Sequence, residues 1–140
     1  DFPNQIVGVK DSTYNLYEKL KINNFSIFPG SETKLLKGLE LGCNGIISAV
    51  CNVTAPIARK VYDDFMNKKP QTVNEKLCAI RKAFDDTENL ISALHSFMAI
   101  RDEKYRRLIP PLTLLSKDKQ KELLNKLKEL DFISTKNIAA

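Results

Sequence analysis

The chain has 140 residues, of which 43% are hydrophobic and 28% charged, and this balance is typical of a folded domain rather than a disordered chain. No apolar run approaches the roughly 18–20 residues that a membrane helix needs, and no signal peptide is evident, so we expect no membrane partner. The net charge of +5 falls mostly in residues 101–140, where acids are interspersed. This mixture favours a solvated helix face over a nucleic-acid-binding patch.

Strand-like and helical patterns alternate through the first 70 residues. Short apolar runs predict three strands, at residues 6–9, 25–28 and 45–50. Helical patterns follow each of them, at 15–20 after a Ser12–Thr13 cap signal, at 32–41 before Gly42, and after residues 52–56 with Ile57, Val61 and Phe65 on one face. Strand, short loop and helix in repetition predict an α/β fold with a parallel sheet covered by helices.

The pattern changes after residue 70, where only helices are expected. Thr72 and Glu75 have the spacing of a capping box, and a second helix is predicted from about residue 88 to residue 99. The run RRLIPPLTLLS must be extended because adjacent prolines break a helix, and Ser116 then caps a last helix.

Three parallel strands cannot close into a barrel, and their open edges invite pairing with further strands. A complete (β/α)8 barrel takes roughly 250 residues. We therefore expect this chain, which begins without methionine, to be part of something larger.

Lys10 stands at the end of the first predicted strand, in the stretch QIVGVKDST. Ligands of α/β proteins bind at the carboxyl ends of strands, and a lysine that loses hydration there can act as a neutral amine and form a Schiff base. A lysine that only reaches solvent or pairs with Asp11 is the structural alternative. The loops at residues 29–32 and 47–52 would add hydroxyls, a carboxylate and a glycine, although Ser31 and Glu32 also suit a helix N-terminus.

The remaining reactive side chains predict neither a metal site nor a cofactor site. Cys43, Cys51 and Cys78 form no C-x-x-C pair, and they are expected to be free thiols in a reducing cytoplasm. His95 is the single histidine and lies among apolar residues, so a packed helical histidine is expected.

The stretch IVGVKDST resembles the sixth barrel strand of the dihydrodipicolinate synthase and N-acetylneuraminate lyase superfamily, where a G-x-K motif presents a Schiff-base lysine. The segment FSIFPGSETKLLKGLELGCNGIISAVCNVTAPIARKVYDDF is similar to the family's seventh and eighth strands with their G-[SD]-[DE] and G-x-I-S-x-x-x-N motifs, and RLIPPLTLLSKDKQKELLNKLKEL is similar to its closing segment. The resemblance implies the C-terminal part of a (β/α)8 TIM barrel, with strands 6–8 in residues 1–70 and a helical extension in residues 71–140 packing on the barrel.

The resemblance also implies a role for each matching residue. Lys10 would form an imine with pyruvate or another 2-oxo acid, and Ser12 would contact the substrate through its hydroxyl. The loop that contacts the distal part of the substrate matches Gly30, Ser31 and Glu32. Ile47 matches the residue whose main chain faces pyruvate, and Ser48 is its neighbour.

The family's glycine–threonine loop, which binds the pyruvate carboxylate, and its Y-N-x-P tyrosine have no counterpart in these residues. We therefore expect the chain alone to be nearly inactive. In a homo-oligomer, a dimer or tetramer, the expected reaction is the condensation of pyruvate with aspartate semialdehyde in lysine biosynthesis. The alternatives are cleavage of a 2-keto-3-deoxy sugar acid or of N-acetylneuraminate, and a non-catalytic half-barrel that acts as an assembly module.

Overall fold

The computed structural model describes residue 2 and residues 4–12 and 15–133. Thr13, which the sequence places in a cap signal, lies outside the described residues. The chain divides into two compact units, residues 1–78 and 79–140, and the division falls within a helix rather than at residue 70. The packing of the helical region on a barrel therefore stays a prediction.

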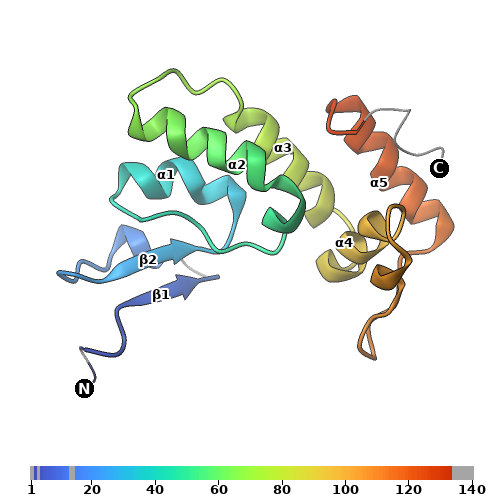
Figure 1. Cartoon of the computed structure of the whole chain (residues 1–140), viewed down its shortest axis with the longest axis horizontal. Helices are drawn as coiled ribbons and strands as arrows, with labels where there is room; N and C mark the ends of the chain where they lie inside the picture. Colours follow the sequence, from blue (N-terminus) through green and yellow to red (C-terminus); the bar gives the residue numbers. More distant parts are fainter. Residues whose placement is uncertain (1, 3, 13–14, 134–140) are drawn as a thin grey trace. The chain divides into compact units, whose positions relative to one another are not determined.

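The first unit is an α/β structure built on two parallel strands (Figure 1). Strand β1 spans Gly8–Asp11 and β2 spans Ser26–Pro29, in a register that pairs Lys10 with Phe28 and Asp11 with Pro29. A 3-10 turn, η1 (Leu16–Glu18), follows β1, and a second, η2 (Glu32–Lys34), leads into helix α1 (Leu35–Glu40). Helix α2 spans Cys51–Met66, and both helices lie on the same side of the strands in Figure 1.

The expected third strand at residues 45–50 is wrong for this structure, which forms a two-stranded sheet. In the segment at residues 45–50, the Ile47 N–H donates to the Pro29 carbonyl at 3.1 Å, so the segment lies beside the end of β2 without pairing along its length. An inner barrel strand is held by hydrogen bonds on both edges and covered on both faces. In the described residues this segment is covered only in part.

Three other boundaries differ from the sequence prediction. Residues 15–20 form only the 3-10 turn η1, because the carboxylate of Asp11 accepts the Leu16 N–H and tightens the chain there. Strand β1 begins two residues later than expected, leaving Ile6 and Val7 exposed. Helix α2 begins at Cys51, so Pro56 lies inside the helix rather than before it.

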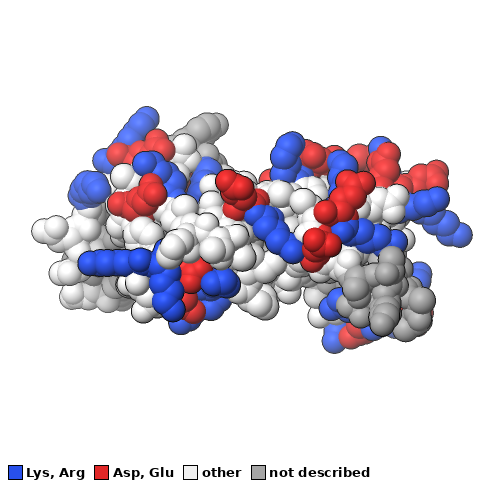
Figure 2. All heavy atoms as spheres, turned by 90° about the horizontal axis from the view of Figure 1, so that it is seen from above, with Lys and Arg blue, Asp and Glu red and all other residues white. Residues whose placement is uncertain are grey.

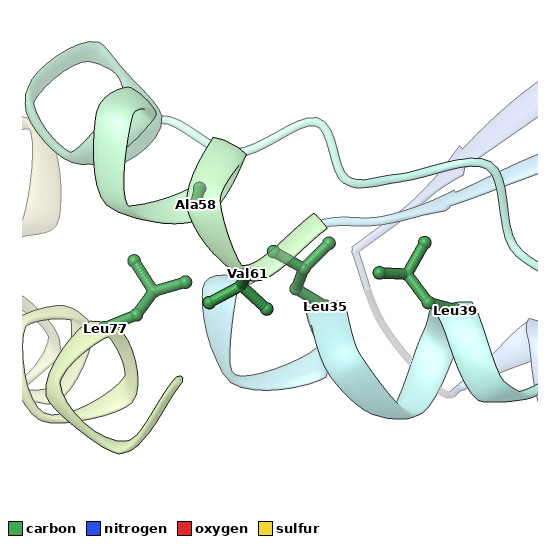
Figure 3. Close-up of a cluster of buried hydrophobic side chains, with 5 residues drawn as sticks. All are labelled: Leu35, Leu39, Ala58, Val61 and Leu77. Atoms are coloured by element: carbon green, nitrogen blue, oxygen red, sulfur yellow. The ribbon is translucent and has the colours of Figure 1, made fainter. Parts of the chain in front are cut away.

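The helical repeat of apolar residues predicts the face of α2 that packs on the core of the first unit. Val61 of this face is buried, and Ile57 and Phe65 are partly buried and pack against the same cluster. Side chains from α1, α2 and the helix α3 (Asn74–Asp85) meet in this cluster (Figure 3), formed by Leu35, Leu39, Ala58, Val61 and Leu77. A second buried cluster contains Tyr17, Ile27 and Cys43.

The second unit contains helix α4 (Leu90–Met98), the 3-10 turn η3 (Glu103–Arg106) and helix α5 (Lys117–Glu129). Ser116 caps α5 as predicted, because its Oγ accepts the Lys119 N–H at 3.3 Å. The aromatic ring of Phe97 packs edge-on against Phe84 and is stacked with Phe132. His95 is packed on α4 as expected, with Nδ1 2.8 Å from the Tyr105 carbonyl oxygen.

Surface charges are mixed in sign. Figure 2 shows lysine and arginine side chains standing beside aspartate and glutamate side chains. Several are paired one helical turn apart, including Arg59 with Asp63 and Lys82 with Asp86. This arrangement is typical of solvated helix faces.

Replacing a fully buried side chain of the first cluster is expected to destabilise the protein. Leu77→Ala removes a fully buried side chain, so the free energy of unfolding should fall by about 2–5 kcal/mol in urea titrations. Met66→Ala, at a site where 58% of the residue is exposed, is the control and should change it by less than about 1 kcal/mol. Equal losses from the two variants would contradict this description of the core.

Candidate functional site

Lys10 occupies the third position of β1 and is exposed in this structure. Its Nζ donates a hydrogen bond to Ser12 Oγ at 2.6 Å. The lysine therefore reaches along the carboxyl end of the strand towards the loop that follows. The structure brings together the two residues that the sequence assigned to amine chemistry and to contact with a substrate.

Asp11 has a structural role on the opposite face of the strand. Neighbouring residues of a strand point to opposite faces, and Asp11 is buried while Lys10 is exposed. Its carboxylate accepts the Leu16 N–H, which holds the turn after β1. Its carbonyl accepts the Gly30 N–H at 2.7 Å, which joins the loops after β1 and β2.

Gly30 packs closely against Ser12. A Cβ added at Gly30 would lie 3.0 Å from Ser12 Oγ and 3.1 Å from Ser12 Cα, closer than side chains ordinarily tolerate. A glycine at this position lets the two loops touch. Lys10, Ser12 and Gly30 thus form one contiguous group.

Ser31 begins the turn after Gly30. Its Oγ accepts the Thr33 N–H at 3.3 Å and lies 2.9 Å from Thr33 Oγ1. The N-cap role considered for Ser31 from sequence is therefore present, and the side chain is half-buried.

Glu32 faces the protein interior. Its exposed fraction is 0%, and its carboxylate accepts hydrogen bonds from Ser48 Oγ at 2.7 Å and from Thr54 Oγ1 at 3.2 Å. The contact with the distal part of a substrate that the resemblance implied for Glu32 would require this carboxylate to become exposed, because it is fully buried in this structure. The structure thus joins Glu32 to Ser48 and turns both towards the interior.

Thr54 is the residue of this group that sequence reasoning missed. It is fully buried in the first turn of α2, and its hydroxyl also lies 3.0 Å from the Val50 carbonyl. The signal was a hydroxyl residue one helical turn after a loop. Only the tertiary structure shows that a carboxylate lies beside it.

Ile47 is exposed at 48%, and its main chain holds its segment to the end of β2 through the Pro29 carbonyl. Ile47 and Ser48 therefore connect the exposed end of the sheet with the buried Glu32 group.

None of the three cysteines forms a disulfide. Burial raises the pKa of the Cys78 thiol, and the negative charges of Glu32 and Glu75 raise it further. In the described part of the chain, no three His, Cys, Asp or Glu side chains gather as metal ligands would. Nor does any described helix have the length and apolar character to cross a membrane.

Comparison with known proteins assigns the chain to a family. The model of the dihydrodipicolinate synthetase family matches residues 3–130. A 4-hydroxy-tetrahydrodipicolinate synthase of Buchnera aphidicola subsp. Cinara cedri is 30% identical over an alignment of 135 residues, and the match covers 87% of this chain and 45% of the relative.

Solved structures of the same fold agree. The dihydrodipicolinate synthase of Agrobacterium tumefaciens superposes with a TM-score of 0.75 at 21% identity, over 92% of this chain and 45% of that one. YagE, an Escherichia coli K12 prophage protein of the dihydrodipicolinic acid synthase family solved with pyruvate, gives a TM-score of 0.75 at 17% identity, over 91% and 47%. The chain thus spans less than half the length of these relatives, and its fold is part of their TIM barrel. The chain belongs to the dihydrodipicolinate synthetase family.

Proposed function

We propose that this chain supplies the Schiff-base lysine, Lys10, of a pyruvate-dependent carbon–carbon lyase of the 4-hydroxy-tetrahydrodipicolinate synthase type. The observation that carries the proposal is the group at the end of β1, where Lys10 Nζ lies 2.6 Å from Ser12 Oγ and Gly30 packs against Ser12. The names of the curated relatives support this reaction type.

In the proposed reaction the neutral Lys10 amine attacks the ketone carbon of pyruvate. A C–N bond forms, the ketone oxygen leaves as water, and uptake of one proton from solvent gives a protonated imine. The imine draws electrons from the methyl group, which releases a proton to solvent, so that an enamine forms. The enamine carbon then forms a C–C bond with the aldehyde carbon of the second substrate, whose oxygen takes up a proton and becomes a hydroxyl, and water hydrolyses the imine to release the product and the Lys10 amine.

Other residues of the group are proposed to orient the substrate. Ser12 Oγ accepts a hydrogen bond from Lys10 and so directs the amine towards the open end of the strand. Ser31 borders this end through the loop, and the main chain of Ile47 with its neighbour Ser48 borders it from the next segment. Gly30 keeps the space between the loops small.

Two paired strands cannot enclose such a site alone. Closing a barrel needs about eight strands, and the exposed Ile6 and Val7 precede β1 at the sheet edge. We propose that activity requires further barrel strands. These strands lie in the part of the family's longer members that this chain does not match. Assembly into a homo-oligomer stays a prediction.

The protein tested is the complete barrel, in which this chain is joined to the remaining strands of a family member. Treatment with pyruvate and borohydride should leave one reduced pyruvate adduct on its Lys10. Peptide mass spectrometry locates the adduct. Lys10→Ala should lose it entirely, because no other amine stands beside Ser12 at the end of β1 in the described residues.

Lys19→Ala is the matched control, since Lys19 is an exposed lysine of the same unit and its loss should leave the adduct yield unchanged. An adduct that survives Lys10→Ala, or its absence from the unaltered complete barrel, would overturn the proposal.

Gly30→Ala should slow adduct formation at low pyruvate by about tenfold to 100-fold, because the added Cβ displaces Ser12 and small misplacements of reacting groups are costly. The measurement is the rate of borohydride-trapped adduct. Gly38→Ala is the control, because it adds a Cβ 3.2 Å from Pro29 Cγ but away from Ser12, and should leave that rate within about twofold of the unaltered protein. Equal rates for the two variants would contradict the role given to Gly30.

A further inference from the structure

Glu32 is the most completely buried charged side chain in the described part of the chain. Removing a carboxylate from water is costly unless hydrogen bonds replace its hydration. Two hydroxyls do so here, Ser48 Oγ at Oε2 and Thr54 Oγ1 at Oε1. The burial of the Glu32 carboxylate is therefore coupled to its hydrogen bonds with these two hydroxyls.

The three residues come from three different segments of the first unit. Glu32 begins η2 three residues after the end of β2, Ser48 lies in the segment before α2, and Thr54 lies in the first turn of α2. The Ile47 amide is bonded to the end of β2, and the Ser48 side chain is bonded to Glu32 one residue later. This segment does not pair as a strand, so side-chain hydrogen bonds such as that of Ser48 help to attach it to the end of β2.

We propose that Glu32 is a positioning residue, whose buried carboxylate fixes the Ile47–Ser48 segment against the end of β2 and does not itself touch the substrate. The inference rests on the proposed function, because it gives the main chain of Ile47 its place beside pyruvate. Losing the carboxylate frees the segment, which moves the backbone away from Lys10 and its substrate.

Amide hydrogen exchange of the 140-residue chain tests the positioning role without reference to activity. Glu32→Met keeps the side-chain length and removes both acceptors, so exchange of the Ile47 amide should accelerate by at least about tenfold. Thr54→Val is nearly isosteric and removes one hydroxyl, so it should accelerate the same amide to a smaller extent, and it carries the test if Glu32→Met does not fold.

The Ser26 amide provides the internal control, because it donates to the Val7 carbonyl at the far end of the strand pair. Its exchange should stay unchanged in both variants, and Thr113→Val, a change at an exposed threonine, should alter neither amide. Unchanged Ile47 exchange in the folded variants would overturn the proposal, as would equal acceleration of both amides.

Kinetics of the completed barrel separate positioning from direct contact. Glu32→Met should raise KM for pyruvate at least severalfold, leave the Lys10 adduct detectable at saturating pyruvate, and change KM for the second substrate little. A raised KM for the second substrate with an unchanged KM for pyruvate would show that Glu32 touches that substrate, and would overturn the inference.

The proposed function and the positioning role of Glu32 can be overturned independently. An unaltered complete barrel that forms no adduct on Lys10 overturns the proposed function, whereas the exchange rates of Ile47 and Ser26 still decide whether Glu32 holds its segment.

Discussion

The parallel pairing of β1 with β2 is the interaction on which the site depends. Lys10 lies opposite Phe28 and Asp11 opposite Pro29, so both strands end at the same edge. The Gly30 N–H extends the pairing one step beyond the strands by donating to the Asp11 carbonyl. Because parallel strands end on the same side, the loops that follow them meet there, and Ser12 comes to lie against Gly30. A shift of one residue in this register would turn Lys10 to the buried face.

A buried carboxylate organises the neighbouring segment. Glu32 lies two residues after Gly30, and the hydroxyls of Ser48 and Thr54 replace the water that it loses. Such groups are expensive to bury alone, yet once paired they specify one arrangement of the segments that carry them. The Lys10 group thus faces solvent, whereas the buried Glu32 group holds the surrounding segments in position.

The sheet has an open edge in the described residues, and the solved relatives are about twice as long as this chain. Ile6 and Val7 are exposed before β1. Exposed apolar residues beside a parallel edge are a place where further strands pair. The segment at residues 45–50 is bonded to β2 through the Ile47 amide without forming a strand.

Local signals were sufficient for much of the fold. The helical repeat of Ile57, Val61 and Phe65 predicted the face of α2 that packs on the buried cluster, and Ser116 predicted the start of α5, because caps and helix faces depend on residues a few positions apart. Lys10, Ser12 and Gly30 could also be named from the sequence, since strand ends and loops are read locally.

The sequence by itself therefore determined the places of helices α1 to α5, two of the three expected parallel strands and the lysine at a strand end. Tertiary structure alone decided that Asp11 holds the turn after β1, that Thr54 belongs with Glu32, and that the Glu32 carboxylate faces inward. The direction of a polar side chain depends on which distant groups replace its hydration, and residues separated by 16 or 22 positions meet only after the chain has folded. The third strand was misjudged for the same reason, because a parallel strand is made by its neighbours rather than by its own apolar run.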